Sequence, residues 1–265
     1  MSRAQPRIIG LPYDASSSHL RGAAAAPPLI RAALHSTAGN WWTEDFGNLE
    51  ASLTDAGDLD VGSPVAVRER IEAGIATLLG TGARPLALGG DHSVTYPVLK
   101  AIHAHHGPCT VLHVDAHPDL YEVFDGDRYS HACPFARIME DGLAARLVQV
   151  GIRAMNGHQR SQVDRYGVEV IDMRAWSSGA RPSIEGLVYV SIDLDGIDPA
   201  HAPGVSHREP GGLTVRDVIG LVQDVGGVLL GADVVEFNPG QDVGGLTAHV
   251  AAKLVKELAS RMLAG

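Results

Sequence analysis

The sequence predicts an α/β fold in which helices flank a parallel sheet of about eight strands. Short apolar segments alternate with longer stretches of helical periodicity along all 265 residues. Several short segments, such as VYVSID and VLLGADVVEF, are apolar throughout, which is typical of strands buried on both faces of a sheet. Because no linker, charge block or repeat divides the chain, we expect residues 1–265 to form one domain.

Eight short segments are the candidate strands. In chain order they are residues 7–11, 52–56, 85–88, 110–115, 147–151, 168–171, 187–193 and 228–236. Ligands of open α/β sheets bind beyond the carboxyl ends of the strands. Functional residues are therefore expected directly after these segments.

The helices between the strands have recognisable start signals. Ser63 followed by Pro64 predicts a capped helix over residues 64–80, because serine caps helices and proline is tolerated at the first helical position. Residues 214–225 and 243–263 are the last two predicted helices.

Composition limits the partners and the cellular location. The 31 acidic and 21 basic residues give a net charge of −10, which argues against nucleic acid or an anionic membrane as the main partner. No apolar run approaches the roughly 18 residues that a membrane span needs. Only two cysteines are present, Cys109 and Cys133, so a disulfide framework is not expected and a cytoplasmic location is predicted.

Aspartate and histidine gather at the ends of two predicted strands. In LHVDAHPDLY, residues Asp115, His117 and Asp119 are spaced two apart, so an extended backbone directs all three to one face. Asp193 and Asp195 have the same spacing in VSIDLDGIDP. Two further segments, ALGGDHSVTYP and VVEFNP, add His92 and Glu236 at the same edge of the sheet.

These side chains predict a metal centre. Unpaired carboxylates at a buried strand end cost several kcal/mol, and the sequence places few basic residues beside them, so a bound cation is the simpler solution. Oxygen and imidazole ligands suit Mn²⁺, with Co²⁺ or Ni²⁺ as possible substitutes, whereas structural zinc sites favour thiolates. Six ligands suit two ions that share bridging carboxylates. The predicted ligands are His92, Asp115, His117, Asp119, Asp193 and Asp195.

The segments GGDHS, DAHPD and SIDLDGIDPAHAPG resemble the three signature blocks of the ureohydrolase family, the arginases and agmatinases. The similarity extends from about residue 11 to residue 258, and the text from DAHPDLY to IMEDG is most similar to the agmatinase-like arginases typical of plants. The resemblance implies a three-layer arginase-like fold with an eight-stranded parallel sheet. It also implies binuclear metal-dependent hydrolysis of a guanidino compound, arginine or agmatine, to urea and a primary amine.

The resemblance also implies a role for each matching residue. The metal ligands divide into a pair for one ion, a pair for the other ion and two bridging residues, which are in that order His92 and Asp119, His117 and Asp195, and Asp115 and Asp193. His131 matches the histidine proposed to relay protons to the leaving amine. Glu236 matches the acid that pairs with the guanidinium of the substrate, a planar cation suited to a fixed carboxylate. Members of the family commonly form trimers or hexamers, so a homo-oligomer is expected.

The substrate is less well determined by the sequence. The loop LYEVFDGDRYSHA carries Glu122, Asp125 and Asp127, which would repel a carboxylate unless Arg128 offsets them, and this favours agmatine. Plant-like arginases share much of this loop and accept arginine, so both substrates and other guanidino compounds stay open.

Predicted roles of other residues concern the tail of the substrate and the core. Asn156 and His207 are candidates for contacts with the tail of the substrate, and His113 is expected to be a buried core histidine. The roles of Cys133, Trp41 and Trp42 stay open.

Three alternative functions are compatible with parts of the pattern. A formiminoglutamase-like hydrolase would share the fold and the ligands. A deacetylase would use one zinc and a paired-histidine motif, for which HAHHG is misplaced. A metal-binding protein without catalysis is disfavoured because His131 and Glu236 are both present.

Overall fold

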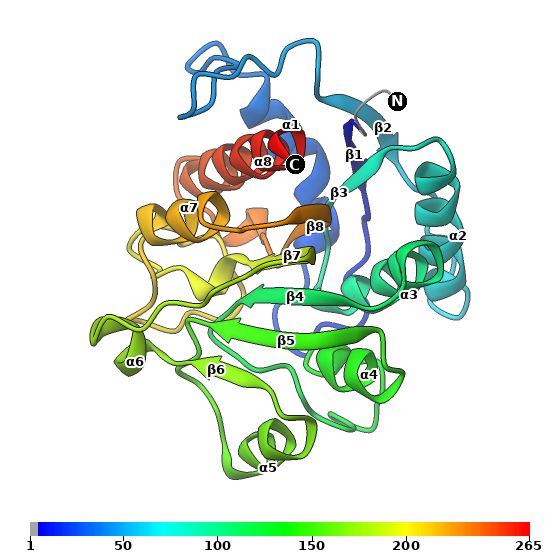
Figure 1. Ribbon diagram of the computed structural model, residues 1–265, viewed down its shortest axis with the longest axis vertical. Coiled ribbons are helices and arrows are strands. Elements are labelled where there is room, and N and C mark those ends of the chain that lie inside the picture. Colours follow the sequence, from blue (N-terminus) through cyan, green and yellow to red (C-terminus); the bar gives the residue numbers. More distant parts are fainter. Residues whose placement is uncertain (1–4) are drawn as a thin grey trace.

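A computed structural model describes residues 5–265, and its sheet has eight parallel strands in the order β2-β1-β3-β8-β7-β4-β5-β6 (Figure 1). The strands are β1 (Pro6–Gly10), β2 (Thr54–Asp58), β3 (Arg84–Leu88), β4 (Cys109–Val114), β5 (Ala144–Val150), β6 (Glu169–Ile171), β7 (Leu187–Asp193) and β8 (Val228–Val235). All eight predicted strands are confirmed.

Helices cover both faces of this sheet and complete three layers (Figure 1). They are α1 (Ala26–Leu34), α2 (Val67–Gly80), α3 (Thr95–His106), α4 (Pro134–Glu140), α5 (Gly157–Tyr166), α6 (Met173–Ser177), α7 (Val215–Gln223) and α8 (Leu246–Ala264). Helices α1, α6, α7 and α8 pack on one face, and α2 to α5 pack on the other. The predicted fold class is therefore confirmed.

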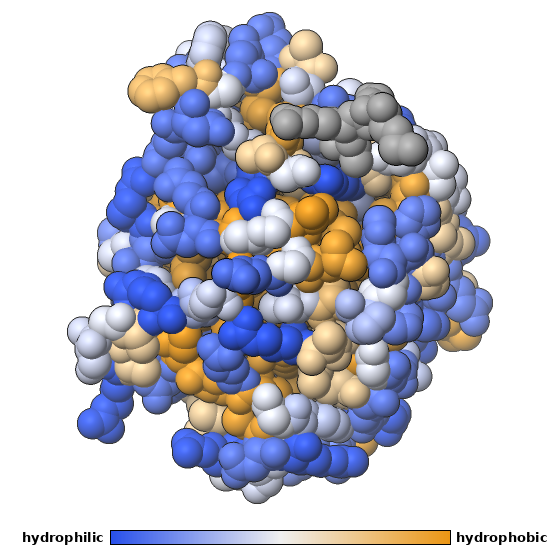
Figure 2. Space-filling model, viewed as in Figure 1, coloured by the Kyte–Doolittle hydropathy of each residue, from blue (hydrophilic) through white to orange (hydrophobic). Residues whose placement is uncertain are grey.

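Two hydrophobic cores follow from the alternation of side chains along each strand. In β3, Leu86 and Leu88 face the α8 side, whereas Ala87 between them faces the α3 side. Because both faces are buried, the strands are apolar throughout, as their sequences indicated. On the face seen in Figure 2, hydrophilic side chains dominate the periphery and smaller apolar areas lie toward the centre. No helix within residues 5–265 is long and apolar enough to cross a membrane.

The two predicted helix starts had different outcomes. Thr214 caps α7 as expected, with its side chain accepting a hydrogen bond from the Asp217 N–H in a capping box. The start predicted at Ser63 is wrong, because α2 begins at Val67 after a separate turn. In that turn the Ala66 N–H donates to the Ser63 carbonyl oxygen at 3.0 Å, so this serine closes a turn and does not cap the helix.

The strand order brings the candidate site together. The four central strands are β3, β8, β7 and β4, and their ends lie nearly level: Leu88 pairs with Val234, Asp193 with Val235, and Val114 with Ile192. Each strand is followed by one of the polar segments found in the sequence. Segments more than 100 residues apart therefore meet at one edge of the sheet.

Candidate metal centre

His92 is surrounded by carboxylates from two neighbouring strand ends. Its Nδ1 atom lies 3.1 Å from Asp119 Oδ2, 3.1 Å from Asp193 Oδ2 and 3.3 Å from Asp115 Oδ2. All four residues are buried. Four potential ligand atoms therefore converge on one point.

A second group of ligand atoms lies beside the first. His117 Nδ1 is 3.2 Å from Asp195 Oδ2 and 3.4 Å from Asp115 Oδ1. Asp115 thus directs one oxygen to each imidazole, as a bridging carboxylate does. The structure brings together all six residues that the sequence predicted as ligands.

The hydrogen bonds behind His92 fit a metal-binding role. The Ser191 hydroxyl donates to Asp233 Oδ1 at 2.6 Å, so its oxygen is left to accept the His92 Nε2–H at 3.0 Å. The proton of the ring then sits on Nε2, and Nδ1 carries a lone pair. This atom is buried and makes no hydrogen bond within the described chain. A lone pair that faces three carboxylates is the arrangement expected of a histidine that binds a cation together with those carboxylates.

The charges of the cluster also fit divalent ions. Burial, and then the nearby Asp195 and Asp115, raise the pKa of Asp193 well above its ordinary value. Burial and Asp115 likewise raise the pKa of Asp195 to about 6. Within residues 5–265 no lysine or arginine side chain forms an ion pair with the four aspartates of the cluster. The carboxylates therefore repel one another until cations bind.

Supporting residues fix the shared carboxylate. His113 is fully buried, as predicted, and its Nε2 lies 2.7 Å from Asp115 Oδ2 while its ring stacks on Phe135 at 3.8 Å. The Asp115 backbone is approached closely by Gly196, where an added Cβ would lie 2.8 Å from the Asp115 nitrogen. A side chain at that glycine would therefore displace the bridging residue.

A histidine–glutamate pair lies next to the cluster. His131 Nδ1 donates to Glu236 Oε1 at 2.9 Å, and the same oxygen accepts the His92 backbone N–H at 2.9 Å. Burial lowers the pKa of His131, but the nearby negative charges, chiefly that of Glu236, together have the larger effect and raise this pKa to about 9. On its other side, His131 Nε2 lies 2.8 Å from Ser18 Oγ and 3.2 Å from the Ser18 backbone nitrogen, and the protonated ring donates to the hydroxyl oxygen.

Two residues of the site have strained backbones. Asp119 has φ of 50° and Glu236 has φ of 62°, a left-handed conformation that side chains other than glycine rarely adopt. Such strain costs of order 1–3 kcal/mol per residue and is concentrated at functional sites.

A cavity of about 200 Å³ opens above the cluster. Its lining consists of Ser18, His117, Asp119, Tyr121, Phe124, His131, Ala132, Ala154, Gln159, Asp193, Asp195, His207 and Glu236. The two predicted tail-binding residues lie differently. His207 lines the cavity, with its ring 5.4 Å from that of His131. Asn156 caps α5 and is not in the lining, but it is hydrogen-bonded to the lining residues Tyr121 and Gln159.

The loop acids that left the substrate open in the sequence, Glu122, Asp125 and Asp127, do not line this cavity. Glu122 pairs with Arg165, and Arg128 pairs with Glu140 at 2.6 Å. Neither Asp125 nor any of these four side chains is among the residues that line the cavity. The repulsion of a substrate carboxylate that the sequence suggested is therefore absent from the lining.

Sequence reasoning missed three polar residues that line the cavity: Ser18, Tyr121 and Gln159. Ser18 lies in a loop without a recognisable motif, more than 100 residues from His131. Gln159 could have been noticed, because it follows Asn156 by three residues in a capping-box pattern that marks the start of α5 beside a strand end.

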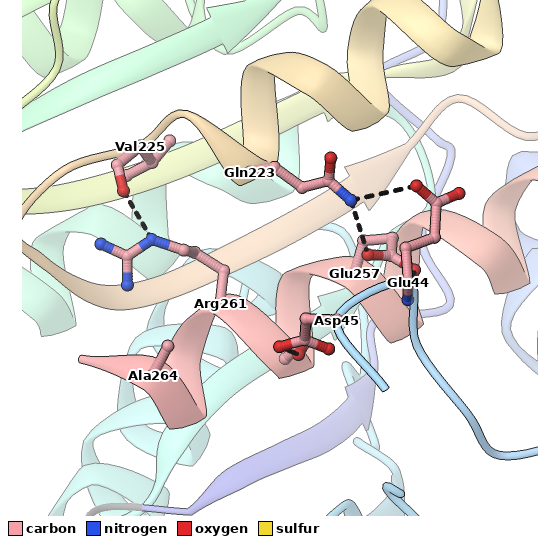
Figure 3. Close-up of a pocket in the computed structure, with 8 residues that line it drawn as sticks. Glu44, Asp45, Gln223, Val225, Glu257, Arg261 and Ala264 are labelled. Carbon is pink, nitrogen blue, oxygen red and sulfur yellow. Dashed lines mark hydrogen bonds between the residues drawn. The ribbon is translucent and has the colours of Figure 1, made fainter. Parts of the chain in front are cut away.

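A larger cavity, of about 690 Å³, lies away from the cluster (Figure 3). It is lined by Glu44, Asp45, Gln223, Val225, Glu257, Ser260, Arg261 and Ala264. Arg261, near the end of α8, donates to the carbonyl oxygens of Val225 and Gly227, which directly precede β8. This cavity is therefore at the amino edge of the sheet.

Fold and site together define a metal-dependent hydrolase of the α/β class. The model of the "Arginase family" matches residues 4–260. The chain belongs to the arginase family, as its sequence blocks predicted.

Known relatives include both arginases and agmatinases. The chain is 46% identical to "Arginase 1, mitochondrial" of Arabidopsis thaliana, over 98% of this chain and 82% of the relative. It is 34% identical to "Agmatinase, mitochondrial" of Gallus gallus, over 95% of this chain and 79% of the relative. A solved arginase from Medicago truncatula has a TM-score of 0.95 at 44% identity, covering 98% of this chain and 88% of that structure.

The comparisons correct the predicted cytoplasmic location. The relatives from Arabidopsis thaliana and Gallus gallus are both named mitochondrial, and these names contradict the prediction of a cytoplasmic location. The prediction rested on a low cysteine count, which reports only on whether disulfides form and cannot distinguish one reducing compartment from another.

Proposed function

We propose that this protein is an amidinohydrolase that uses two Mn²⁺ ions to hydrolyse a guanidino compound, arginine or agmatine, to urea and a primary amine. The observation that carries the proposal is the division of the Asp115 oxygens between His92 and His117. One shared carboxylate between two imidazole groups is the arrangement that two adjacent ions require.

The six clustered residues are the proposed ligands. His92 and Asp119 hold one ion, His117 and Asp195 hold the other, and Asp115 and Asp193 bridge them. Oxygen and imidazole ligands without a thiolate favour Mn²⁺, and Co²⁺ or Ni²⁺ fit the same set. When bound, the metal pair lowers the pKa of water and so makes a strong nucleophile available near neutral pH.

Glu236 and His131 have separate proposed tasks. The burial of Glu236 and its two hydrogen bonds hold its carboxylate in one orientation, which suits the planar guanidinium group. Although burial opposes it, His131 lowers the pKa of Glu236, so this acid stays ionised. His131 then donates a proton to the amine as it leaves, because an amine departs far more readily than an amide anion.

His207 and Asn156 are proposed to act on the substrate tail. His207 lines the cavity and can contact the tail directly, whereas Asn156 acts by holding Tyr121 through a hydrogen bond of 2.6 Å. We also propose that residues 1–265 form one domain. We further propose that this domain assembles into a homo-oligomer, a trimer or a hexamer, because members of the family commonly do so.

The test is urea release after loading with Mn²⁺. Purified protein is supplied with L-arginine, agmatine or 4-guanidinobutyrate, and urea is measured. We expect urea from at least one compound and none after chelation. Two bound ions without urea from any of the three would reject the proposed function.

A further inference from the structure

We infer that Tyr121 and Gln159 select a substrate whose tail carries a carboxylate, so that L-arginine is preferred over agmatine. This inference rests on the proposed hydrolysis of guanidino compounds and adds the choice between the two substrates. It follows from the hydrogen-bond donors of Tyr121 and Gln159 that remain unpaired in the cavity lining.

The orientation of Asn156 is fixed by the backbone. Its Oδ1 accepts the Gln159 N–H at 3.0 Å, so the other side-chain atom is the Nδ2 donor. Nδ2 lies 2.6 Å from the Tyr121 hydroxyl oxygen, which must therefore act as the acceptor. The hydroxyl proton of Tyr121 has no acceptor of its own in the described part of the chain and is left for a substrate.

The capping box between Asn156 and Gln159 also fixes the orientation of the Gln159 side-chain amide. The Asn156 backbone N–H can only donate, and it donates to Gln159 Oε1 at 3.2 Å. The Nε2 amide of Gln159 therefore keeps both of its protons, and no hydrogen bond from it is formed within residues 5–265. Gln159 is only 3% exposed and lines the cavity, so its remaining hydrogen-bonding capacity lies on a buried wall.

This wall therefore presents donors to the cavity. An ionised carboxylate only accepts hydrogen bonds, whereas an ammonium group only donates them. The α-carboxylate of L-arginine can satisfy the Tyr121 hydroxyl and the Gln159 amide. Agmatine lacks this carboxylate and has only an ammonium group at its tail, so it leaves both donors unpaired. Unpaired polar groups in a desolvated site are the strongest basis for rejecting a near-identical substrate.

The charges of the lining agree with the hydrogen bonds. Glu236 is the only carboxylate in the lining outside the proposed ligands, and the proposed function assigns it to the guanidinium group. Glu122 is paired with Arg165, and the 42%-exposed side chain of Glu209 lies 3.7 Å from His117 Nε2. Both substrates carry a positively charged ammonium group on the tail. In L-arginine the neighbouring carboxylate offsets this charge, whereas agmatine has no such group and the lining has no carboxylate outside the proposed ligands and Glu236.

Two substitutions separate this role from a structural one. Gln159→Glu replaces the amide donor with a carboxylate but keeps an oxygen for the Asn156 N–H, so the capping box is retained. Tyr121→Phe removes the hydroxyl alone. Tyr166→Phe is the matched control, because this tyrosine lies on the same helix as Gln159 and bonds to Glu140, away from the cavity.

The experiment measures kcat/KM for L-arginine and agmatine in each Mn²⁺-loaded variant. Tyr121→Phe should lose about tenfold with L-arginine and little with agmatine, as expected for one hydrogen bond to a charged group. Gln159→Glu should lower the arginine-to-agmatine ratio by about 100-fold, since a donor becomes a like charge. Calorimetric binding of the product amines gives a second readout, with L-ornithine weakened and putrescine strengthened in Gln159→Glu.

Two outcomes would overturn the inference while leaving the proposed function intact. One is urea release with agmatine preferred by the unmodified protein. The other is an equal loss for both substrates in Tyr121→Phe and Gln159→Glu. Failure of the proposed function itself looks different, because no guanidino compound would then yield urea from the unmodified protein.

Discussion

Acidic side chains are concentrated in two regions of the molecule, and the two regions differ in whether basic or donor groups are paired with them. At the carboxyl edge of the sheet, four aspartates converge without a lysine or arginine partner in the described chain. At the amino edge, the acids of the larger cavity are matched by cations and donors (Figure 3).

In the amino-edge cavity, side chains of the protein itself pair with the carboxylates. Glu257 is buried and binds Lys253 Nζ at 2.5 Å and Gln223 Nε2 at 3.2 Å. Glu44 accepts two hydrogen bonds from Arg216, at 2.6 and 2.8 Å. Because these carboxylates are satisfied by the chain itself, they need no ligand, although their cavity is the larger one. The balance of charge, and not the size of the cavity, identifies the functional site.

The largest expected effect comes from removing a charge from the metal centre. Asp193→Asn should lower kcat/KM by about 1000-fold, because several kcal/mol of metal-dependent stabilisation are lost. The metal-free protein should become more stable, by about 1 kcal/mol, since a buried like charge disappears. Activity assays and urea denaturation of the metal-free protein check both parts. A less stable metal-free variant would contradict the proposed repulsion.

Removal of the metal should have the next largest effect. An ion present at about 1000 times its dissociation constant stabilises the folded state by about 4 kcal/mol. Chelation should therefore lower the Tm of the unmodified protein by several degrees and abolish urea release. The Tm of Asp193→Asn should fall less on chelation. An equal fall in both proteins would place the bound ions elsewhere.

The amino-edge region should respond in the opposite sense. Glu257→Gln should reduce the free energy of unfolding by about 2 kcal/mol, because Lys253 loses the buried one of its two carboxylate partners and keeps only Glu44. Its kcat/KM should stay within about twofold, since the residue is remote from the proposed ligands. Glu69→Gln on the exposed surface of α2 is the matched control and should change neither quantity. A large loss of activity in Glu257→Gln would contradict the distinction between a structural region at the amino edge and a functional region at the carboxyl edge.

The smallest effect concerns pH. Arg216 chiefly lowers the pKa of Glu44 from 4.5 to about 2, with further hydrogen bonds from Gln223 and Lys253. A lowered pKa contributes stability that is complete above pH 4.5 and is lost as the pH falls toward 2. Solvent screens this pair, so the contribution is below about 1 kcal/mol. The stability difference between the unmodified protein and Glu44→Gln should therefore shrink between pH 5 and pH 2.5, and a constant difference would exclude this contribution.

Local patterns predicted most of the fold and the cluster, but not the cavity. Alternating apolar segments located every strand, and the spacing of Asp115, His117 and Asp119 placed three side chains on one face, because both depend only on backbone periodicity. The contact between Ser18 and His131 could not be predicted, because it depends on how distant loops meet. The placement of the acids in the 122–127 loop could not be predicted for the same reason, since Glu122 pairs with the distant Arg165 and none of these acids lines the cavity.

The central claim is that the unmatched aspartates bind two ions for catalysis, and metal content measured together with urea release tests it most directly. Mass spectrometry of the loaded protein should find two Mn²⁺ per chain, and His92→Ala should retain about one while losing most activity. Full urea release from a protein with no bound metal, or unchanged metal content and activity in His92→Ala, would contradict the account.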